Sequence, residues 1–238
     1  MIADAFRFVQ IHPYLFANLP LLAADILIAR RTPYRDYGRA AIFSGLVCML
    51  CAPVEATTGD YWHPLLLGGW RVGIESLIFT FTSGATVWLV SAAPMRKTGT
   101  IGVRTLRDSF LRIVLGALPV SFLYVILWRL GVNSLTATLI APTGLVLFLL
   151  YRRSHLWRLS LYGLLFFPLL SLAVINVQFA FWPNYLAYWN PNGTWSTLVF
   201  GIPRGELAFA FMFGAYCPVI IASALDMRIQ AFRNSTGN

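Results

Sequence analysis

Long apolar stretches alternate with short polar segments along the whole chain. Seven stretches are about 20 residues long, the length that a helix needs to cross the roughly 30 Å hydrocarbon core of a bilayer. The seventh is longer, and we expect it to be tilted or to begin with a polar cap outside the hydrocarbon. The pattern predicts seven membrane-spanning helices, near residues 11–29, 40–57, 72–92, 110–130, 132–151, 160–182 and 197–225.

The composition favours the same class of protein. Hydrophobic residues make up 58% of the 238 residues and charged residues only 11%, whereas soluble domains carry about 25% charged residues. So many apolar side chains require lipid as their solvent, and we expect an all-α integral membrane protein. The opening MIADAFRFVQIHPY lacks the basic start and the cleavage site of a signal peptide, so we expect the first helix to direct insertion.

Basic residues gather in alternate connections between the predicted helices. Fourteen of the 18 lysines and arginines fall on one side, and the four others are Arg7, Arg71, Arg129 and Arg204. The positive-inside rule places the richer side in the cytoplasm. We therefore expect an inner-membrane protein of a bacterium, with its N-terminus outside and its C-terminus in the cytoplasm. Because the charges lie in these loops, the net charge of +9 does not indicate nucleic-acid binding.

Two segments at equivalent places in this topology resemble each other. They are GDYWHPLLLGGWRVGIESLIFTF at 59–81 and NGTWSTLVFGIPRGELAFAF at 192–211. Each places a tryptophan in an outer loop, and then follow an apolar stretch, a glycine, a glutamate and an apolar–aromatic run. A parallel repeat of three helices explains both the likeness and the shared direction. We divide the chain into a first repeat at 1–95, a connecting loop and fourth helix at 96–131, and a second repeat at 132–238.

Four of the nine acidic residues fall in the outer half, namely Glu55, Asp60, Glu75 and Glu206. A charged group in hydrocarbon costs a few kcal/mol, so Glu75 and Glu206 indicate a site. Arg71 precedes Glu75 by four residues, and a local ion pair that fixes packing is one interpretation. Arg204 points elsewhere on a helix from Glu206, and Pro203 is expected to break or cap that helix. A carboxyl group in a dry pocket keeps its proton and can act as a general acid.

Other polar residues have simpler interpretations. Asp25 and Asp226 lie near the inner ends of the first and seventh spans, beside arginines, so we expect them to snorkel or pair at the interface. Cys48 and Cys51 form a C-x-x-C inside an apolar run without nearby histidine or cysteine partners. We interpret them as small buried apolar residues rather than as a metal or redox site.

Several functions known in membrane proteins require residues that this sequence lacks. A retinal protein needs a lysine in its last span, whereas the only lysine is Lys97, in a loop. The histidines His12, His63 and His155 are scattered at span ends and do not form haem pairs. Acidic residues are never adjacent or two apart, as a magnesium–diphosphate site would require, and no G-x-G-x-x-G is present. We expect no metal, no cofactor and no redox reaction.

The segments EATTGDYW at 55–62, GIESLIF and GIPRGELAF resemble the integral-membrane lycopene cyclase domain family. That family is built from units of three spans, and each unit carries an outer acid–turn–Trp stretch and then Pro-x-Glu-Glu before Leu and Phe. The first copy here lacks the proline and reads Glu75-Ser76, while the second has Pro203 but reads Gly205-Glu206. Each copy therefore keeps one glutamate. Related layouts occur in membrane cyclases of smaller terpenoids and in carotenoid hydratases.

The resemblance implies acid-initiated, non-redox ring closure of a hydrophobic isoprenoid, most simply β-ring formation in lycopene. Glu206 and Glu75 are the candidate acid and base, and Glu55 is the third candidate. Arg71 and Arg204 are candidate supporting residues. Aromatic ring faces stabilise carbocations as they do other cations, and the candidate substrate-binding rings are Trp62, Phe79, Trp195 and Phe209.

Two other classes of function stay open at this point. A small-solute transporter would use arginine and glutamate inside the membrane, although other polar residues are scarce along the spans. The incomplete glutamate pairs would also fit a non-catalytic membrane scaffold, or half of a larger assembly such as a homo-oligomer.

Overall fold

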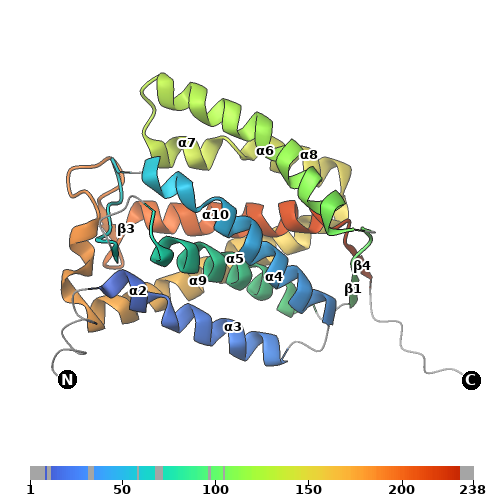
Figure 1. Cartoon of the computed structure of the whole chain (residues 1–238), viewed down its shortest axis with the longest axis horizontal. Coiled ribbons are helices and arrows are strands. Elements are labelled where there is room, and N and C mark those ends of the chain that lie inside the picture. The colour runs from blue at the N-terminus through green and yellow to red at the C-terminus, as the bar shows by residue number, and fades with distance from the viewer. Residues whose placement is uncertain are drawn as a thin grey trace, which may run out of the picture.

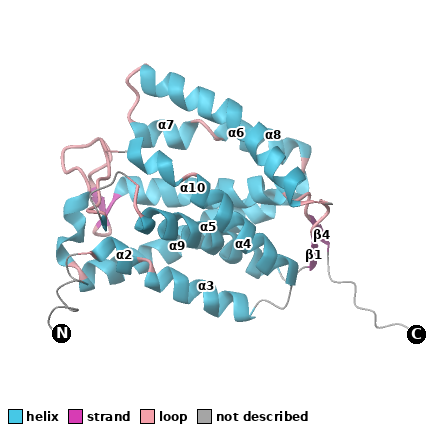
Figure 2. Cartoon of the chain, in the orientation of Figure 1, coloured by secondary structure: helices cyan, strands magenta, loops and turns pink. Residues whose placement is uncertain are grey.

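The chain folds into a bundle of helices that run between two ends (Figure 1). The computed structural model describes Val9 and residues 12–31, 35–57, 59–67, 72–95, 98–103 and 105–230. It is mostly helical (Figure 2), as the sequence predicts. Seven helices or helix pairs in the described residues are long and apolar enough to cross a membrane: Pro13–Arg31, Asp36–Val54, Ile74–Met95, Leu106–Arg129, Ser134–Arg152, Ser154–Phe181 and Arg204–Ala224.

The α-helices are α2 (Pro13–Ala17), α3 (Leu19–Arg31), α4 (Arg35–Leu50), α5 (Ile74–Ala92), α6 (Leu106–Arg129), α7 (Ser134–Ile140), α8 (Thr143–Arg152), α9 (Trp157–Phe181) and α10 (Arg204–Ala224). Short 3₁₀ helices are η1 (Ala52–Thr57), η3 (Ala93–Met95), η4 (Ser154–Leu156) and η5 (Pro183–Tyr188). The strands are β1 (Thr98–Thr100), β2 (Leu198–Val199), β3 (Ile202–Pro203) and β4 (Arg228–Gln230).

Two of the seven spans are interrupted. The first divides into α2 and α3 at Asn18, whose side-chain Nδ2 donates a hydrogen bond to the carbonyl of Tyr14 at 2.9 Å. The fifth divides into α7 and α8 at Ala141 and Pro142, because a proline inside a helix lacks the N–H donor and clashes with the preceding turn.

Short antiparallel strands mark the two ends of the bundle (Figure 1). β1 pairs with β4 at one end, which we call the β1 end. β2 pairs with β3 at the opposite end, the β2 end. The connection between these last two strands is Phe200 and Gly201, which both have positive φ, at 53° and 79°. That conformation is typical of a two-residue type I′ hairpin and favours glycine.

The hairpin changes the seventh predicted span. Residues 198–203 form β2 and β3, so the helix starts at Arg204 and not near residue 197. Pro203 is its N-cap residue, with an extended ψ of 128°, as the sequence predicts. Glu206 occupies the first turn of this helix.

α5 lies at the centre of the bundle and α6 at its edge. In Ile74–Met95, 67% of the most apolar window is buried, whereas none of the corresponding window of Leu106–Arg129 is. The largest core cluster surrounds Trp88 of α5, whose indole Nε1 donates to the carbonyl of Tyr37 at 3.1 Å. Small residues allow close helix contacts elsewhere. Gly84 of α5 lies against Ser44 of α4, and Gly163 of α9 lies against Gly214 of α10.

Candidate active site

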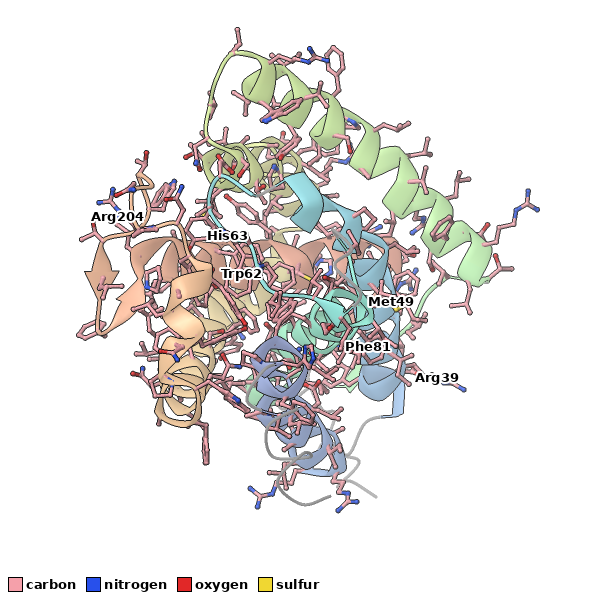
Figure 3. All side chains as sticks on the ribbon, turned by 60° about the vertical axis from the view of Figure 1, so that its left-hand side comes forward. Arg39, Met49, Trp62, His63, Phe81 and Arg204 are labelled. Carbon is pink, nitrogen blue, oxygen red and sulfur yellow. The ribbon has the colours of Figure 1, made fainter. Side chains whose placement is uncertain are left out.

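A cluster of aromatic side chains fills the β2 end of the bundle. Trp62, labelled in Figure 3, belongs to this cluster. Its ring lies 4.2 Å from that of Trp189, 5.5 Å from that of Tyr14 and 5.8 Å from that of Tyr185. The backbones of Trp62 and Trp189 also form an isolated antiparallel bridge. This bridge fixes the 59–67 loop against the segment that follows α9, so the two loops make one wall.

The carboxyl group of Glu206 lies against this cluster. Its Oε1 accepts a hydrogen bond from the Tyr61 hydroxyl at 3.1 Å and another from Trp189 Nε1 at 2.9 Å. Both donors are neutral and buried, at 4% and 6% exposed. Within the described part of the chain, no lysine or arginine forms an ion pair with Glu206, and both side-chain hydrogen bonds to its carboxyl group reach Oε1.

Tyr61 stays a hydrogen-bond donor in this position. Burial raises the pKa of its phenol, and the hydrogen bond to Glu206 raises the pKa further. The hydroxyl therefore keeps its proton over the whole physiological range, and it stabilises any negative charge that develops on Glu206 Oε1.

Gly205 leaves no room for a side chain next to Glu206. A Cβ at this position would lie 2.6 Å from the Tyr61 hydroxyl oxygen and 2.7 Å from a methyl carbon of Leu135. Any side chain here would displace Tyr61 from Glu206. Only glycine leaves room for the donor that binds the neighbouring carboxyl group.

Glu75 occupies a different environment. It is fully buried in the first turn of α5, and its Oε1 accepts a hydrogen bond from the backbone N–H of Leu67 at 2.7 Å. No described residue bonds its Oε2, which lies so close to Gly73 that a Cβ there would overlap it. Because α5 begins at Ile74, Glu75 is the second residue of the helix. Arg71 lies outside the described residues, and its pairing with Glu75 stays a prediction.

The structure links Glu75 and Glu206 only indirectly. They share no hydrogen-bond partner among the described residues, but the loop at 59–67 contacts both, through Tyr61 at one end and Leu67 at the other. Glu55 belongs to η1, and its side chain lies outside the part that the structure describes.

All four candidate substrate-binding rings pack in the aromatic cluster at the β2 end, and none of them is fully buried. Phe79 lies 5.6 Å from the Tyr14 ring, and Phe209 stacks on Phe213 at 5.3 Å. Trp195 donates through Nε1 to the Thr136 hydroxyl at 2.9 Å. Residues that the sequence places in opposite halves therefore meet at one end of the bundle.

Arg204 supports a loop and does not pair with Glu206. The side chain is exposed and projects at the edge of the molecule (Figure 3). Its guanidinium carbon lies 5.3 Å from the centre of the Trp195 ring, and a terminal nitrogen donates to the carbonyl of Thr194 at 2.5 Å. It thereby fixes the loop that carries Trp195.

Two acidic residues take roles that the sequence does not predict. Asp60 accepts hydrogen bonds from Asn133 Nδ2 at 2.7 Å, from the Ser134 N–H at 3.0 Å and from the Ser134 hydroxyl, which fastens the 59–67 loop to the start of α7. The snorkelling expected for Asp25 is wrong, because its side chain is buried against α5. Asp25 is 7% exposed and accepts a hydrogen bond from the Thr86 hydroxyl of α5 at 2.6 Å.

A cavity of about 480 Å³ adjoins the aromatic cluster and lies between α4, α6, α8 and α10. Leu139 and Phe209 line it toward the β2 end, and Arg112 and Arg153 line it toward the β1 end. Its volume lies within the roughly 300–1,000 Å³ of small-molecule sites, and its wall is otherwise almost entirely apolar.

The three cysteines all line this cavity as free thiols. Cys48 and Cys217 are buried with their sulfur atoms 3.8 Å apart, whereas Cys51 is exposed, contrary to the expectation that it is buried. No group of three or more potential ligands among the described residues is arranged to hold a metal ion.

Comparison with protein families, with characterised proteins and with solved structures found no match for this chain. The candidate site therefore has to be interpreted from its own geometry.

Proposed function

We propose that the protein is a membrane isoprenoid cyclase in which Glu206 supplies the proton that starts ring closure. The observation that supports this role is the arrangement around its carboxyl group. Oε1 receives two neutral donors, so we place the acidic proton on Oε2. Carboxyl groups in apolar surroundings without a cationic partner favour the protonated form.

The chemistry needs no co-reactant. The O–H bond of Glu206 breaks as a C–H bond forms at a terminal double bond of the isoprenoid, which leaves a tertiary carbocation. A neighbouring double bond attacks the cation to form the C–C bond of the ring, and a base then removes a proton. The product is an isomer of the substrate. Tyr61 and Trp189 stabilise the carboxylate through Oε1, and nearby ring faces stabilise the cation.

Glu75 is the proposed base, and the resemblance to the integral-membrane lycopene cyclase domain family supports both assignments. Its Oε2 has no partner in the described region and can accept a proton. β-Ring formation in lycopene is the simplest reaction of this type. The apolar wall of the adjacent cavity favours a hydrophobic substrate over the small polar solute of a transporter.

We also propose that helices α3–α5 and α7–α10 form the two parallel repeats, with the β1 end in the cytoplasm of a bacterium. α5 packs on α3 and α4 much as α10 packs on α7, α8 and α9. Gly84 follows Glu75 by nine residues and Gly214 follows Gly205 by nine, and each glycine lies against the preceding span of its own half. This correspondence supports a common ancestor for both halves.

Expression in a bacterial host that accumulates lycopene tests the proposal. Cyclised isomers of unchanged mass, separated by chromatography, would support it. Glu206→Gln keeps the shape of the side chain and removes the transferable proton, so we expect turnover to fall by about 10²–10⁴-fold. Asp36→Asn is the matched control, because Asp36 lies at the start of α4, outside the site, and pairs with Arg39 at 3.3 Å.

The proposal fails if folded Glu206→Gln protein still forms rings at close to the normal rate. Lycopene that stays unchanged in the host would exclude that substrate and restrict the proposal to other isoprenoids.

A further inference from the structure

We propose that the cavity between α4, α6, α8 and α10 binds one single-chain isoprenoid that carries a phosphate head group, with its head at Arg112 and Arg153. This inference names the substrate class of the proposed cyclase. It rests on the proposed function only for the later ring closure of the bound hydrocarbon chain. The binding itself follows from the shape and the charge of the cavity.

The cavity extends along α10. It is lined by α10 residues from Phe209 to Ala224, and 15 steps of about 1.5 Å give a length of roughly 22 Å. Its wall is almost entirely apolar along this length, which suits a flexible hydrocarbon chain. We call this elongated cavity the slot.

The two ends of the slot differ in chemistry. The β1 end has Arg112 and Arg153 in the cavity wall, while the rest of the wall has no other charged residue. A lycopene-like hydrocarbon makes no use of two guanidinium groups. An amphiphile with an anionic head group uses both the apolar slot and its basic end.

The arginines are only partly neutralised by the protein. Arg153 pairs with Asp226 at 2.7 Å, and Arg112 lies 3.9 Å from the same carboxylate oxygen. Arg228 is the third cation that acts on Asp226. Three guanidinium groups around one carboxylate leave two positive charges in this described group. Guanidinium binds phosphate oxygens in a planar, two-bond geometry, so a phosphate monoester is a suitable partner.

The other end of the slot approaches the proposed acid. Phe209 lines the cavity and follows Glu206 by three residues, which places both on one face of α10. A chain held by its head at Arg112 therefore has its terminal double bond directed toward Glu206. Protonation at that end leaves the carbon–oxygen bond of the phosphate ester intact, so the head group serves for binding and is not a leaving group.

Alkylation of the cavity cysteines provides a direct binding assay. Cys51 is exposed and lines the slot, so a bound chain covers it. Detergent-solubilised protein is treated with N-ethylmaleimide, and labelling is followed by mass spectrometry. We expect geranylgeranyl phosphate to slow the labelling of Cys51 at concentrations about tenfold below those at which geranylgeraniol does.

Variants identify the head-group site. Arg112→Gln is the main test, because its contact with Asp226 is long and its loss leaves the Arg153 pair in place. We expect it to weaken protection by the phosphate about tenfold and to leave protection by the alcohol unchanged. Asp226→Asn removes the competing carboxylate and should strengthen protection. Arg39→Gln is the control, since Arg39 is exposed on α4 and does not line the cavity.

Equal protection by the alcohol and the phosphate would overturn the inference, and so would phosphate protection that Arg112→Gln does not change. Protection by dioleoyl phosphatidic acid alone would overturn it in favour of a two-chain membrane lipid. If the unmodified protein binds geranylgeranyl phosphate but forms no ring from any isoprenoid, the cyclase is refuted and the binding site stands, whereas absent binding refutes this inference alone.

Discussion

The contact between Gly163 of α9 and Gly214 of α10 is the most sensitive packing point that the structure offers for a test. A Cβ on Gly163 would overlap the carbonyl oxygen of Gly214, and a Cβ on Gly214 would overlap the carbonyl oxygen of Gly163. Both obstacles are backbone atoms, which cannot rotate away as a side chain can. Gly214→Ala must therefore separate the two helices that carry much of the second half.

The change in unfolding free energy that Gly214→Ala causes has two opposing parts. Alanine in place of a helical glycine stabilises by about 0.5–1 kcal/mol when nothing obstructs it. Overpacking a close contact costs about 1–3 kcal/mol. Gly144 of α8 has no atom within 4 Å of an added Cβ, so Gly144→Ala is a matched control that keeps only the first part. The difference in unfolding free energy between the two variants isolates the clash, at about 1–3 kcal/mol.

Thermal unfolding in detergent, followed by tryptophan fluorescence, measures this difference. For a chain of this size, about 1 kcal/mol shifts the midpoint by roughly 2–4 °C, so Gly214→Ala should melt about 2–12 °C below Gly144→Ala. Adding Gly163→Ala to Gly214→Ala should cost less than the sum of the single changes, because one separation relieves both clashes. Equal midpoints for Gly214→Ala and Gly144→Ala would refute the close backbone contact.

The spans could be predicted from the sequence because each follows from local composition. A run of about 20 apolar residues is long enough to cross a bilayer wherever it occurs, and all seven predicted stretches overlap observed helices. The cap at Pro203 is equally local, since it depends on one residue's fixed φ. Asn18 interrupts the first span without a comparable signal, because asparagine also occurs inside helices.

The site could be predicted only in part, because its contacts join distant segments. Glu206 stands out in the sequence as a carboxyl group in an apolar run, but its donor Tyr61 lies 145 residues away. The segment around Trp189 is interpreted equally well as an interfacial belt, and only the fold directs its indole N–H to Glu206. Asp25 is the opposite case. The arginines near it in the sequence suggest a position at the membrane surface, whereas in the fold its carboxyl group accepts a hydrogen bond from Thr86.

Two further predictions concern the ends of the bundle. Reporter fusions at Lys97 and Arg152 should report the cytoplasm and a fusion at Asn192 the outside, and a cytoplasmic Asn192 would contradict the proposed orientation. Acid should weaken the β1 end through Asp226. The hydrogen bond from Arg153 lowers the pKa of Asp226 below its usual 3.8, so its stabilising contribution is complete above about pH 4 and is lost as the pH falls through the lower, folded-state pKa. The carboxylate is partly open to solvent, so the contribution is about 1 kcal/mol at most. Asp226→Asn should therefore unfold slightly more easily than the unmodified protein at pH 7 and lose less stability between pH 4 and pH 2. Parallel pH profiles for the two proteins would show that the pair contributes nothing to folding.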